Sequence, residues 1–357
     1  MVFQGDEMVF ATQATNLFAN FQQALLVFTS IVYEALPFIL LGALVAGLLE
    51  ELLPPRLLLR VLPKSRFVGI LVGALLGLIF PMCECGIVPV MRRLLRKGLP
   101  LSTSTAYLLA GPVINPVVLM STYVAFSGME ETLDSGGKLA YQMGGPTMMV
   151  FRAVLAYGVA VGASLVVDFL WRRYGSEKLL TASAMPDRNL EKTLQGRDLS
   201  FKARLDRITA TVLHDFVDIT TFLVLGSGLA ATVRFFLTHE TIASWTDSHI
   251  VLAISLMMGL AILLCLCSEA DAFVAASFVK MAPTAKLAFL VLGPMCDFKL
   301  MALYTRVFKP KLIVCIFGTV ILLVFLGSLA AHQIWINIAP ALMGDGNFIP
   351  PTIQGSK

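Results

Sequence analysis

The chain has 357 residues, of which 57% are hydrophobic and only 14% are charged, with a formal net charge of +4. A soluble domain would carry about a quarter charged residues, so this composition excludes an ordinary soluble protein and predicts a polytopic membrane protein. The net charge does not indicate nucleic-acid binding, because the basic residues cluster beside apolar segments, where they orient a protein in the bilayer. Residues 1–23 lack the basic start of a cleavable signal peptide, so we expect the first apolar segment to remain as a helix.

Six segments are apolar over the roughly 20 residues that a membrane-spanning helix needs. In chain order they are 24–49, 101–126, 147–171, 216–237, 284–304 and 312–336. Two more, 67–91 and 250–281, are interrupted in the middle and either cross as bent helices or return as re-entrant hairpins. The positions of Lys and Arg favour hairpins, because these place most basic residues on one side of the membrane, as the positive-inside rule requires.

We therefore predict an all-α polytopic membrane protein with six full spans and two hairpins. The predicted parts are an N-terminal segment 1–23, a first transmembrane repeat 24–171, a basic cytoplasmic linker 172–213, a second transmembrane repeat 214–339 and a C-terminal tail 340–357. An odd number of spans in each repeat makes the two repeats run in opposite directions, which is the inverted-topology repeat of many secondary transporters. Both termini then lie outside the plasma membrane. Eight spans in a parallel repeat is the alternative.

The two repeats are recognised by residues that match at one constant offset along the chain. The matched positions are Gly77 and Gly259, Cys83 and Cys265, Cys85 and Cys267, Gly111 and Gly293, and Pro112 and Pro294. Cysteine is scarce, with six in the chain, so a chance match of two Cys-x-Cys pairs and two Gly-Pro pairs is improbable. The sequence thus indicates an internal duplication built around two kinds of helix break.

The Gly-Pro breaks at 111–112 and 293–294 lie near the middle of predicted spans. Non-helical backbone at membrane depth is tolerated only where protein or a water-filled cavity satisfies its polar groups. A broken helix there presents carbonyl groups and a half-helix N-terminus to a substrate or an ion. Asn115 and Asp297 stand at matching positions after the two breaks. The alternative interpretation is a packing kink, which is common in membrane helices.

The Cys-x-Cys pairs allow three hypotheses. Cysteine packs well as a small hydrophobic residue, which suffices for Cys315. Thiolates also bind soft or borderline species such as Cu(I), Zn(II) or trivalent metalloids. The third hypothesis is thiol–disulfide exchange carried across the membrane. The in-register duplication beside Glu84 and Glu269 favours a chemical role over packing.

The charges near these breaks are mostly acidic. They are Glu84, Glu269, Asp271 and Asp297, against Lys299. This excess favours a cationic ligand or a protonatable relay, and we expect Lys299 to pair with Asp297 or Asp271, since isolated charges in the membrane seldom stay unpaired. No catalytic motif is present, and we expect the four histidines, 214, 239, 249 and 332, at solvated helix ends.

Three segments resemble the ArsP-like permease family. They are Phe80-Pro81-Met82-Cys83-Glu84-Cys85-Gly86, Ala110-Gly111-Pro112-Val113-Ile114-Asn115-Pro116 and Cys267-Ser268-Glu269-Ala270-Asp271-Ala272-Phe273. The resemblance covers roughly residues 24–336 and implies an integral plasma-membrane permease. Characterised members of the family export trivalent organoarsenicals, and others are described as subunits of two-component permease complexes.

The favoured function is a permease, not an enzyme, that moves a small thiophilic metalloid or metal species and needs no cofactor. The predicted substrate-binding residues are Cys83, Glu84, Cys85, Gly111, Pro112, Asn115, Cys265, Cys267, Glu269, Asp271, Gly293, Pro294, Asp297 and Lys299. Cys83, Cys85, Cys265 and Cys267 are the candidate ligands for a soft metal or metalloid. The expected partners are the lipid bilayer, the substrate, and a second permease subunit or another copy of the chain. The alternative functions are a transmembrane thiol–disulfide carrier and a complex subunit without its own substrate site.

Overall fold

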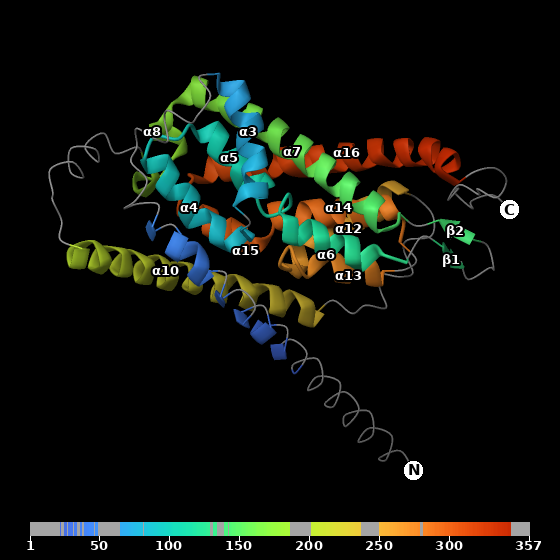
Figure 1. The fold of residues 1–357 in the computed structure, drawn as a ribbon, viewed down its shortest axis with the longest axis horizontal. Coiled ribbons are helices and arrows are strands. Elements are labelled where there is room, and N and C mark those ends of the chain that lie inside the picture. Colours follow the sequence, from blue (N-terminus) through green and yellow to red (C-terminus); the bar gives the residue numbers. More distant parts are fainter. Residues whose placement is uncertain are drawn as a thin grey trace, which may run out of the picture.

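The computed structural model describes, besides scattered helical positions between 22 and 48, residues 65–80, 82–128, 131–133, 139–141, 143–185, 201–236, 250–278 and 281–343. Within these residues the chain is almost entirely helical, with one short β hairpin (Figure 1). Nearly all of the N-terminal segment 1–23, much of the first predicted span, His239, His249 and the end of the tail lie outside the described residues. The sides predicted for the two termini therefore stay predictions.

The first half of the chain forms a series of helices that break where the sequence predicts. They are α3 (Arg66–Ile79), α4 (Glu84–Arg96), α5 (Leu101–Ala110), α6 (Pro116–Phe126) and α7 (Gly145–Tyr174). Between α6 and α7, β1 (Glu131–Leu133) pairs antiparallel with β2 (Leu139–Tyr141). The predicted span 101–126 is thus two helices, because Pro112 lacks the N–H that a continuous helix needs. Pro116 is tolerated as the first residue of α6, where that N–H would have no partner within the helix.

The second half of the chain forms another series of helices. After α8 (Ser176–Leu179) and a 3-10 turn η1 (Ala182–Ala184), it contains α10 (Phe201–Phe236), α12 (Ile250–Leu264), α13 (Asp271–Ser277), α14 (Pro283–Leu292), the 3-10 turn η2 (Gly293–Met295), α15 (Phe298–Tyr304) and α16 (Pro310–Met343). Helix α10 begins within the predicted linker 172–213. The charged residues at its start, such as Lys202 and Arg204, are good helix formers and extend the apolar helix toward the linker.

Three helical segments of the described chain are long and apolar enough to cross a membrane: Gly145–Tyr174, Pro283–Tyr304 and Pro310–Asn337. The second comprises α14, η2 and α15 and meets the length and composition of a span with its break included. Large apolar side chains point outward from the other two, including Val154, Phe169 and Val314. Exposed apolar surface of this kind suits contact with lipid, so the protein is embedded in a membrane.

Asp168 marks one end of the helical bundle. Its Oδ1 accepts a hydrogen bond from Ser102 Oγ at 3.2 Å and lies 3.7 Å from Arg66 Nη1. Arg66 begins α3 and Ser102 begins α5, which directly follows α4. The chain between them therefore leaves this end along α3 and comes back along α4.

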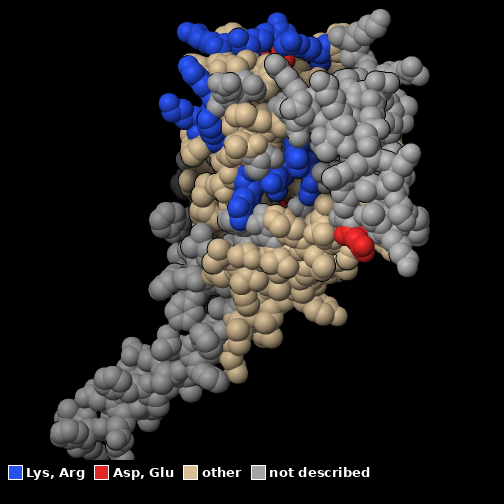
Figure 2. Space-filling model, turned by 90° about the vertical axis from the view of Figure 1, so that its left-hand side faces the viewer, with Lys and Arg blue, Asp and Glu red and all other residues tan. Residues whose placement is uncertain are grey.

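This end of the bundle is also its basic end. The Lys309 N–H donates to the Leu179 carbonyl at 2.9 Å, and the Thr181 N–H donates to the Val307 carbonyl at 3.0 Å. These bonds bring the turn between α15 and α16 beside the residues that follow α7. Figure 2 shows Lys and Arg side chains gathered over much of this face, which is the left-hand side in Figure 1.

Helix α3 packs on α5 through glycines. A Cβ added at Gly73 would lie 2.7 Å from the Thr103 carbonyl oxygen, and one at Gly77 would lie 2.6 Å from the Gly111 Cα. Such small residues let helix backbones approach closely in a membrane, where there is no hydrophobic force between helices. At Gly259, the matching residue of Gly77 in α12, the same added atom would meet none of the described residues within 4 Å. The two halves are therefore packed differently at this position.

The opposite end of the bundle contains the start of α14. Thr284 Oγ1 lies 3.2 Å from His332 Nδ1, and His332 belongs to the later part of α16. The prediction that the histidines lie at helix ends is therefore wrong for His332, which is buried inside a helix. It is also wrong for His214, which lies in the interior of α10. The apolar patterns of α10 and α16 continue past the predicted span limits, so these residues fall within helices.

Candidate functional site

The half-helices α4, α6, α13 and α15 each begin with a polar side chain. Glu84 and Asp271 are the first residues of α4 and α13, and Asn115 and Asp297 cap the N-termini of α6 and α15. A helix N-terminus has N–H groups without partners and a partial positive charge, so an acidic or amide oxygen is favoured there. The breaks in the sequence thus place acceptor oxygens inside the membrane region.

An ion pair between Lys299 and Glu84 joins the two halves. Lys299 Nζ lies 2.8 Å from Glu84 Oε1 and 3.8 Å from Asp297 Oδ2. Ser268, in the break between α12 and α13, donates its hydroxyl hydrogen bond to Glu84 Oε2 at 3.2 Å. Glu84, Lys299 and Ser268 are fully buried. The start of α4 therefore contacts both breaks of the second half.

The prediction that Lys299 pairs with Asp297 is confirmed by their ion pair at 3.8 Å, but a closer partner was missed. The carboxylate closest to Lys299 is that of Glu84 in the other half, whereas the predicted Asp297 is farther away and Asp271 pairs with Arg152 instead. Glu84 is closest because the packing of the halves brings α4 against α15. That contact joins residues far apart in the chain, so the charges near each break could not show it.

Arg152, in α7, was not among the predicted site residues. Its Nη2 lies 2.8 Å from Asp271 Oδ2 and donates to the Ser268 carbonyl at 3.4 Å, while Nη1 donates to Thr122 Oγ1 at 2.7 Å. The Arg152 side chain is fully buried. An arginine within the apolar segment 147–171 was the sequence feature that could have revealed it, because ionisable residues in the membrane are rare and functional.

Ser268 connects these two sets of contacts, since its carbonyl faces Arg152 and its hydroxyl faces Glu84. We call the whole network the central cluster. It comprises Glu84, Thr122, Arg152, Ser268, Asp271, Asp297 and Lys299. Its residues come from α4, α6 and α7 in the first half and from both helix breaks in the second half. A buried network of this kind is stable only while each charge keeps its partner.

Four cysteines are direct chain neighbours of cluster residues: Cys83 and Cys85 flank Glu84, Cys267 precedes Ser268, and Cys296 precedes Asp297. All six cysteines lie within the described part of the chain and are thiols rather than disulfides. Cys83 lies within electrostatic range of Cys267 in the other half, and both Cys85 and Cys267 lie within range of Lys299. No three His, Cys, Asp or Glu side chains of the described residues are close enough to hold a metal ion together. The two pairs are thus near one another without forming a ready metal site.

Cys265 has an unusual backbone. Its φ is +47°, and it is the only residue other than glycine with positive φ in the described part of the chain. That conformation crowds the Cβ of an ordinary residue, and such strain clusters at functional sites. The thiol of Cys265 donates to the Ile262 carbonyl and faces the first backbone N–H groups of α15. Its counterpart Cys83 has an unstrained φ of −72°.

The residues of the Gly-Pro breaks have clear local contacts. Asn115 Oδ1 accepts from the Val117 N–H at 2.9 Å, and Asp297 Oδ1 accepts from the Leu300 N–H at 2.6 Å. Both side chains therefore cap the helix after the break. Gly111 and Pro112, and likewise Gly293 and Pro294, lie buried in the two breaks. Glu269 is half-buried in the loop before α13 and directly follows Ser268 of the central cluster.

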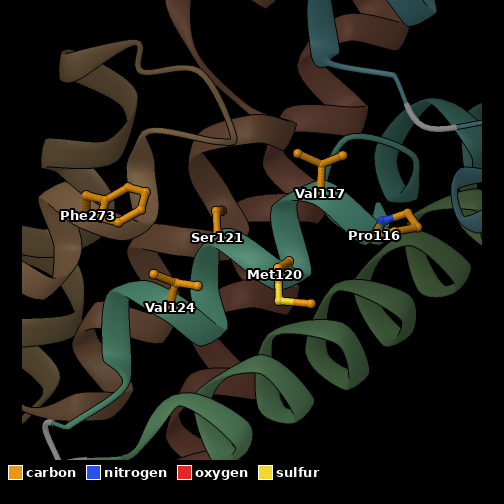
Figure 3. A pocket seen from close by; sticks show the side chains of 6 residues that line it. All are labelled: Pro116, Val117, Met120, Ser121, Val124 and Phe273. Carbon is orange, nitrogen blue, oxygen red and sulfur yellow. The ribbon is translucent and has the colours of Figure 1, made fainter.

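A hollow of about 510 Å³ lies between α6 and α13, on the surface that faces lipid. Figure 3 shows the side chains that line it, which are Pro116, Val117, Met120, Ser121, Val124 and Phe273. All but Ser121 are apolar. The hollow contains none of the predicted site residues, although it adjoins Asn115 and Asp271 along the chain.

The comparisons with known proteins agree with this membrane architecture. Residues 20–333 match a family described as "Predicted permease". The chain belongs to this permease family. The match covers both halves and every residue of the central cluster. No solved structure is similar enough to match.

Two relatives align over most of their length. The chain is 32% identical over 315 residues to the UPF0718 protein YcgR of Bacillus subtilis, covering 87% of this chain and 97% of the relative. It is 34% identical over 308 residues to a Streptococcus mutans protein whose name describes it as a proposed subunit of a two-component membrane permease complex, covering 85% and 93%. The resemblance inferred from the motifs is thereby confirmed.

Proposed function

We propose that the chain is a plasma-membrane permease that moves its substrate by alternating access through the central cluster. The observation that carries this proposal is the Glu84–Lys299 ion pair, which joins broken helices of the two halves. Charged side chains at membrane depth are costly and mark substrate or ion pathways. Membership of a permease family supports the same class of function.

The proposed architecture is an inverted-topology repeat of six spans and two hairpins. The contacts of Asp168 with Arg66 and Ser102 support a first hairpin that opens toward the basic end. The contact between Thr284 and His332 puts the start of α14 at the opposite end, which supports a second hairpin opening that way. Inverted repeats bring matching breaks together near the midplane, as the central cluster requires.

The basic end is proposed to face the cytoplasm, because Lys and Arg accumulate in cytoplasmic loops. In a chain without other cysteines, Lys178→Cys should react with an impermeant maleimide only after cells are opened. Asn337→Cys, near the other end of α16, should react in intact cells. The reverse pattern of labelling would mean that the orientation is inverted.

The proposed substrate is a small thiophilic species, such as a trivalent organoarsenical. Such a species binds two thiolates at once, and Cys83 and Cys267 directly precede Glu84 and Ser268, which are hydrogen-bonded across the two halves. The thiols are proposed to contact the substrate during passage rather than to hold a resident metal. Glu84 and Lys299 would then keep the charges of the pathway balanced while it passes.

Uptake into everted vesicles, over a panel of trivalent metalloids and soft metal ions, tests this function. Cys83→Ser should lower transport of the moved species by about tenfold or more, because a hydroxyl replaces a soft ligand. Cys315→Ser is the matched control, since Cys315 lies half-buried on α16 and is not a member of the central cluster, and it should transport normally. Normal transport by Cys83→Ser would rule out the thiol as a substrate ligand.

The name of the Streptococcus relative favours one variant of this proposal, in which the chain works with a second membrane subunit. Purified chain reconstituted alone would then show no transport for any species of the panel. Transport would appear when the partner subunit is reconstituted with it.

A further inference from the structure

Helix α7 contains two buried charged residues with different kinds of partner. Arg152 lies seven residues after its start, and Asp168 lies near its basic end. Their separation along the helix is about 24 Å at the rise of 1.5 Å per residue. Asp168 contacts α3, α5 and Arg172, which all belong to the first half. Arg152 instead reaches across to the second half.

The Arg152 contacts form a clamp on the tip of the second-half hairpin. The guanidinium bonds to the Asp271 carboxylate at the start of α13 and to the Ser268 carbonyl in the preceding break. Its third partner, Thr122, lies on α6, which packs against α13. A guanidinium presents several donors in a fixed fork, so it can hold all three groups in one geometry.

Ser268 transmits this clamp to the ion pair that joins the halves. While Arg152 holds the Ser268 carbonyl, the Ser268 hydroxyl is held against Glu84. Within the described part of the chain, Arg152 forms no hydrogen bond or ion pair of its own with Glu84 or Lys299. It therefore acts on them through the break before α13.

The position of Arg152 along α7 indicates on which side of the central cluster the clamp acts. Arg152 lies toward Gly145, the end of α7 opposite to the basic end. The segment it holds is the strained one, since Cys265 at positive φ lies in the same break. The matching first-half hairpin is instead fixed by glycine contacts between α3 and α5. Beside the apolar packing of α12 and α13, the tip of the second-half hairpin is thus held by polar contacts that can break and reform.

We propose that Arg152 is a positioning residue that keeps the central cluster closed toward the side opposite the basic end, by clamping Asp271 and Ser268 of the second-half hairpin. This inference rests on the proposed permease function. Release of the clamp lets the tip of α13 move away from α6 and α7 and opens the cluster to that side, which is the exterior in the proposed orientation. Rebinding closes it before the substrate leaves on the other side.

The test measures access to the cluster and not transport. A chain that keeps Cys83 as its only cysteine is reacted with an impermeant maleimide, added from the exterior to intact cells or from the cytoplasmic side to everted vesicles. The variant Arg152→Gln/Asp271→Asn removes the clamp without leaving an unpaired buried charge. Arg152→Lys keeps the positive charge but lacks the fixed, forked arrangement of the guanidinium donors. Asp168→Asn is the matched control, because it removes a charge of the same helix with partners in one half only.

We expect the exterior reaction rate to rise by about tenfold or more in the double variant, with no change from the cytoplasmic side. Arg152→Lys should give an intermediate rise, and Asp168→Asn should leave the exterior rate unchanged. An unchanged exterior rate in the double variant, or an equal rise from both sides, would overturn the proposal. So would failure of both Arg152 variants to accumulate as folded protein, since the residue would then be needed for folding. None of these results decides the proposed permease function, which the transport measurement with Cys83→Ser tests separately.

Discussion

Lys299→Met should destabilise the folded protein by about 3–5 kcal/mol, because it leaves the buried Glu84 and Asp297 carboxylates without their cation. All three side chains are buried, so water cannot replace the lost partner. The measurement is the free energy of unfolding of the purified protein in detergent, from a denaturant titration. Lys311→Met is the matched control, since Lys311 is exposed near the start of α16, and it should change stability by less than about 0.5 kcal/mol.

The double variant Glu84→Gln/Lys299→Met separates the charge from the shape of the site. Removal of both partners leaves no Glu84 charge to compensate, so it should recover most of the stability lost in Lys299→Met. If the double variant is as unstable as the single one, the stability lost in Lys299→Met comes mainly from the unpaired Asp297 carboxylate or from the lost packing of the Lys299 side chain. If Lys299→Met is as stable as the parent, the ion pair does not hold the two halves together.

Gly77→Ala should destabilise the protein by about 1–3 kcal/mol, which is the usual cost of overpacking a close contact. The added Cβ would lie 2.6 Å from the Gly111 Cα and 2.9 Å from the Ile114 carbonyl oxygen, and neither backbone atom can move without shifting the first Gly-Pro break. The thermal midpoint in detergent and the transport rate should both fall, because this contact positions α6 as well.

Gly259 provides the control for this substitution. The predicted repeat matches it to Gly77, yet a Cβ there meets none of the described residues within 4 Å. Gly259→Ala should therefore be neutral, or stabilising by up to about 1 kcal/mol through the higher helix propensity of alanine. Equal effects of the two substitutions would show that the close contact of α3 with α5 does not decide stability.

Local sequence features predicted most of the helices and their breaks. The apolar length of 147–171 and 312–336 corresponds to α7 and α16, and the proline of each Gly-Pro pair marks a real interruption. These features depend on hydrogen bonding and apolar length within one segment, so a single sequence contains them. The helix ends are less well predicted, as the early start of α10 shows.

The partners within the site were beyond this kind of prediction. Lys299 meets Glu84, and Asp271 meets Arg152, across more than a hundred residues of chain. Which charge meets which depends on how the two halves pack, and no periodicity or spacing records that packing. The roles of Asn115 and Asp297 as helix caps were also missed, although an Asn or Asp directly before a new helix is a known N-cap pattern.

Transport of a trivalent methylated arsenical by the Glu84→Gln/Lys299→Met double variant, in proteoliposomes, tests most directly whether the central cluster is the transport site. If the ion pair balances charge in the pathway, the folded double variant should transport at less than about a tenth of the parent rate. The reason is that charged residues inside the membrane, such as Glu84 and Lys299, mark the pathway of a substrate or ion. Transport at the parent rate by a correctly folded double variant would contradict this and reduce the pair to a structural contact between the halves.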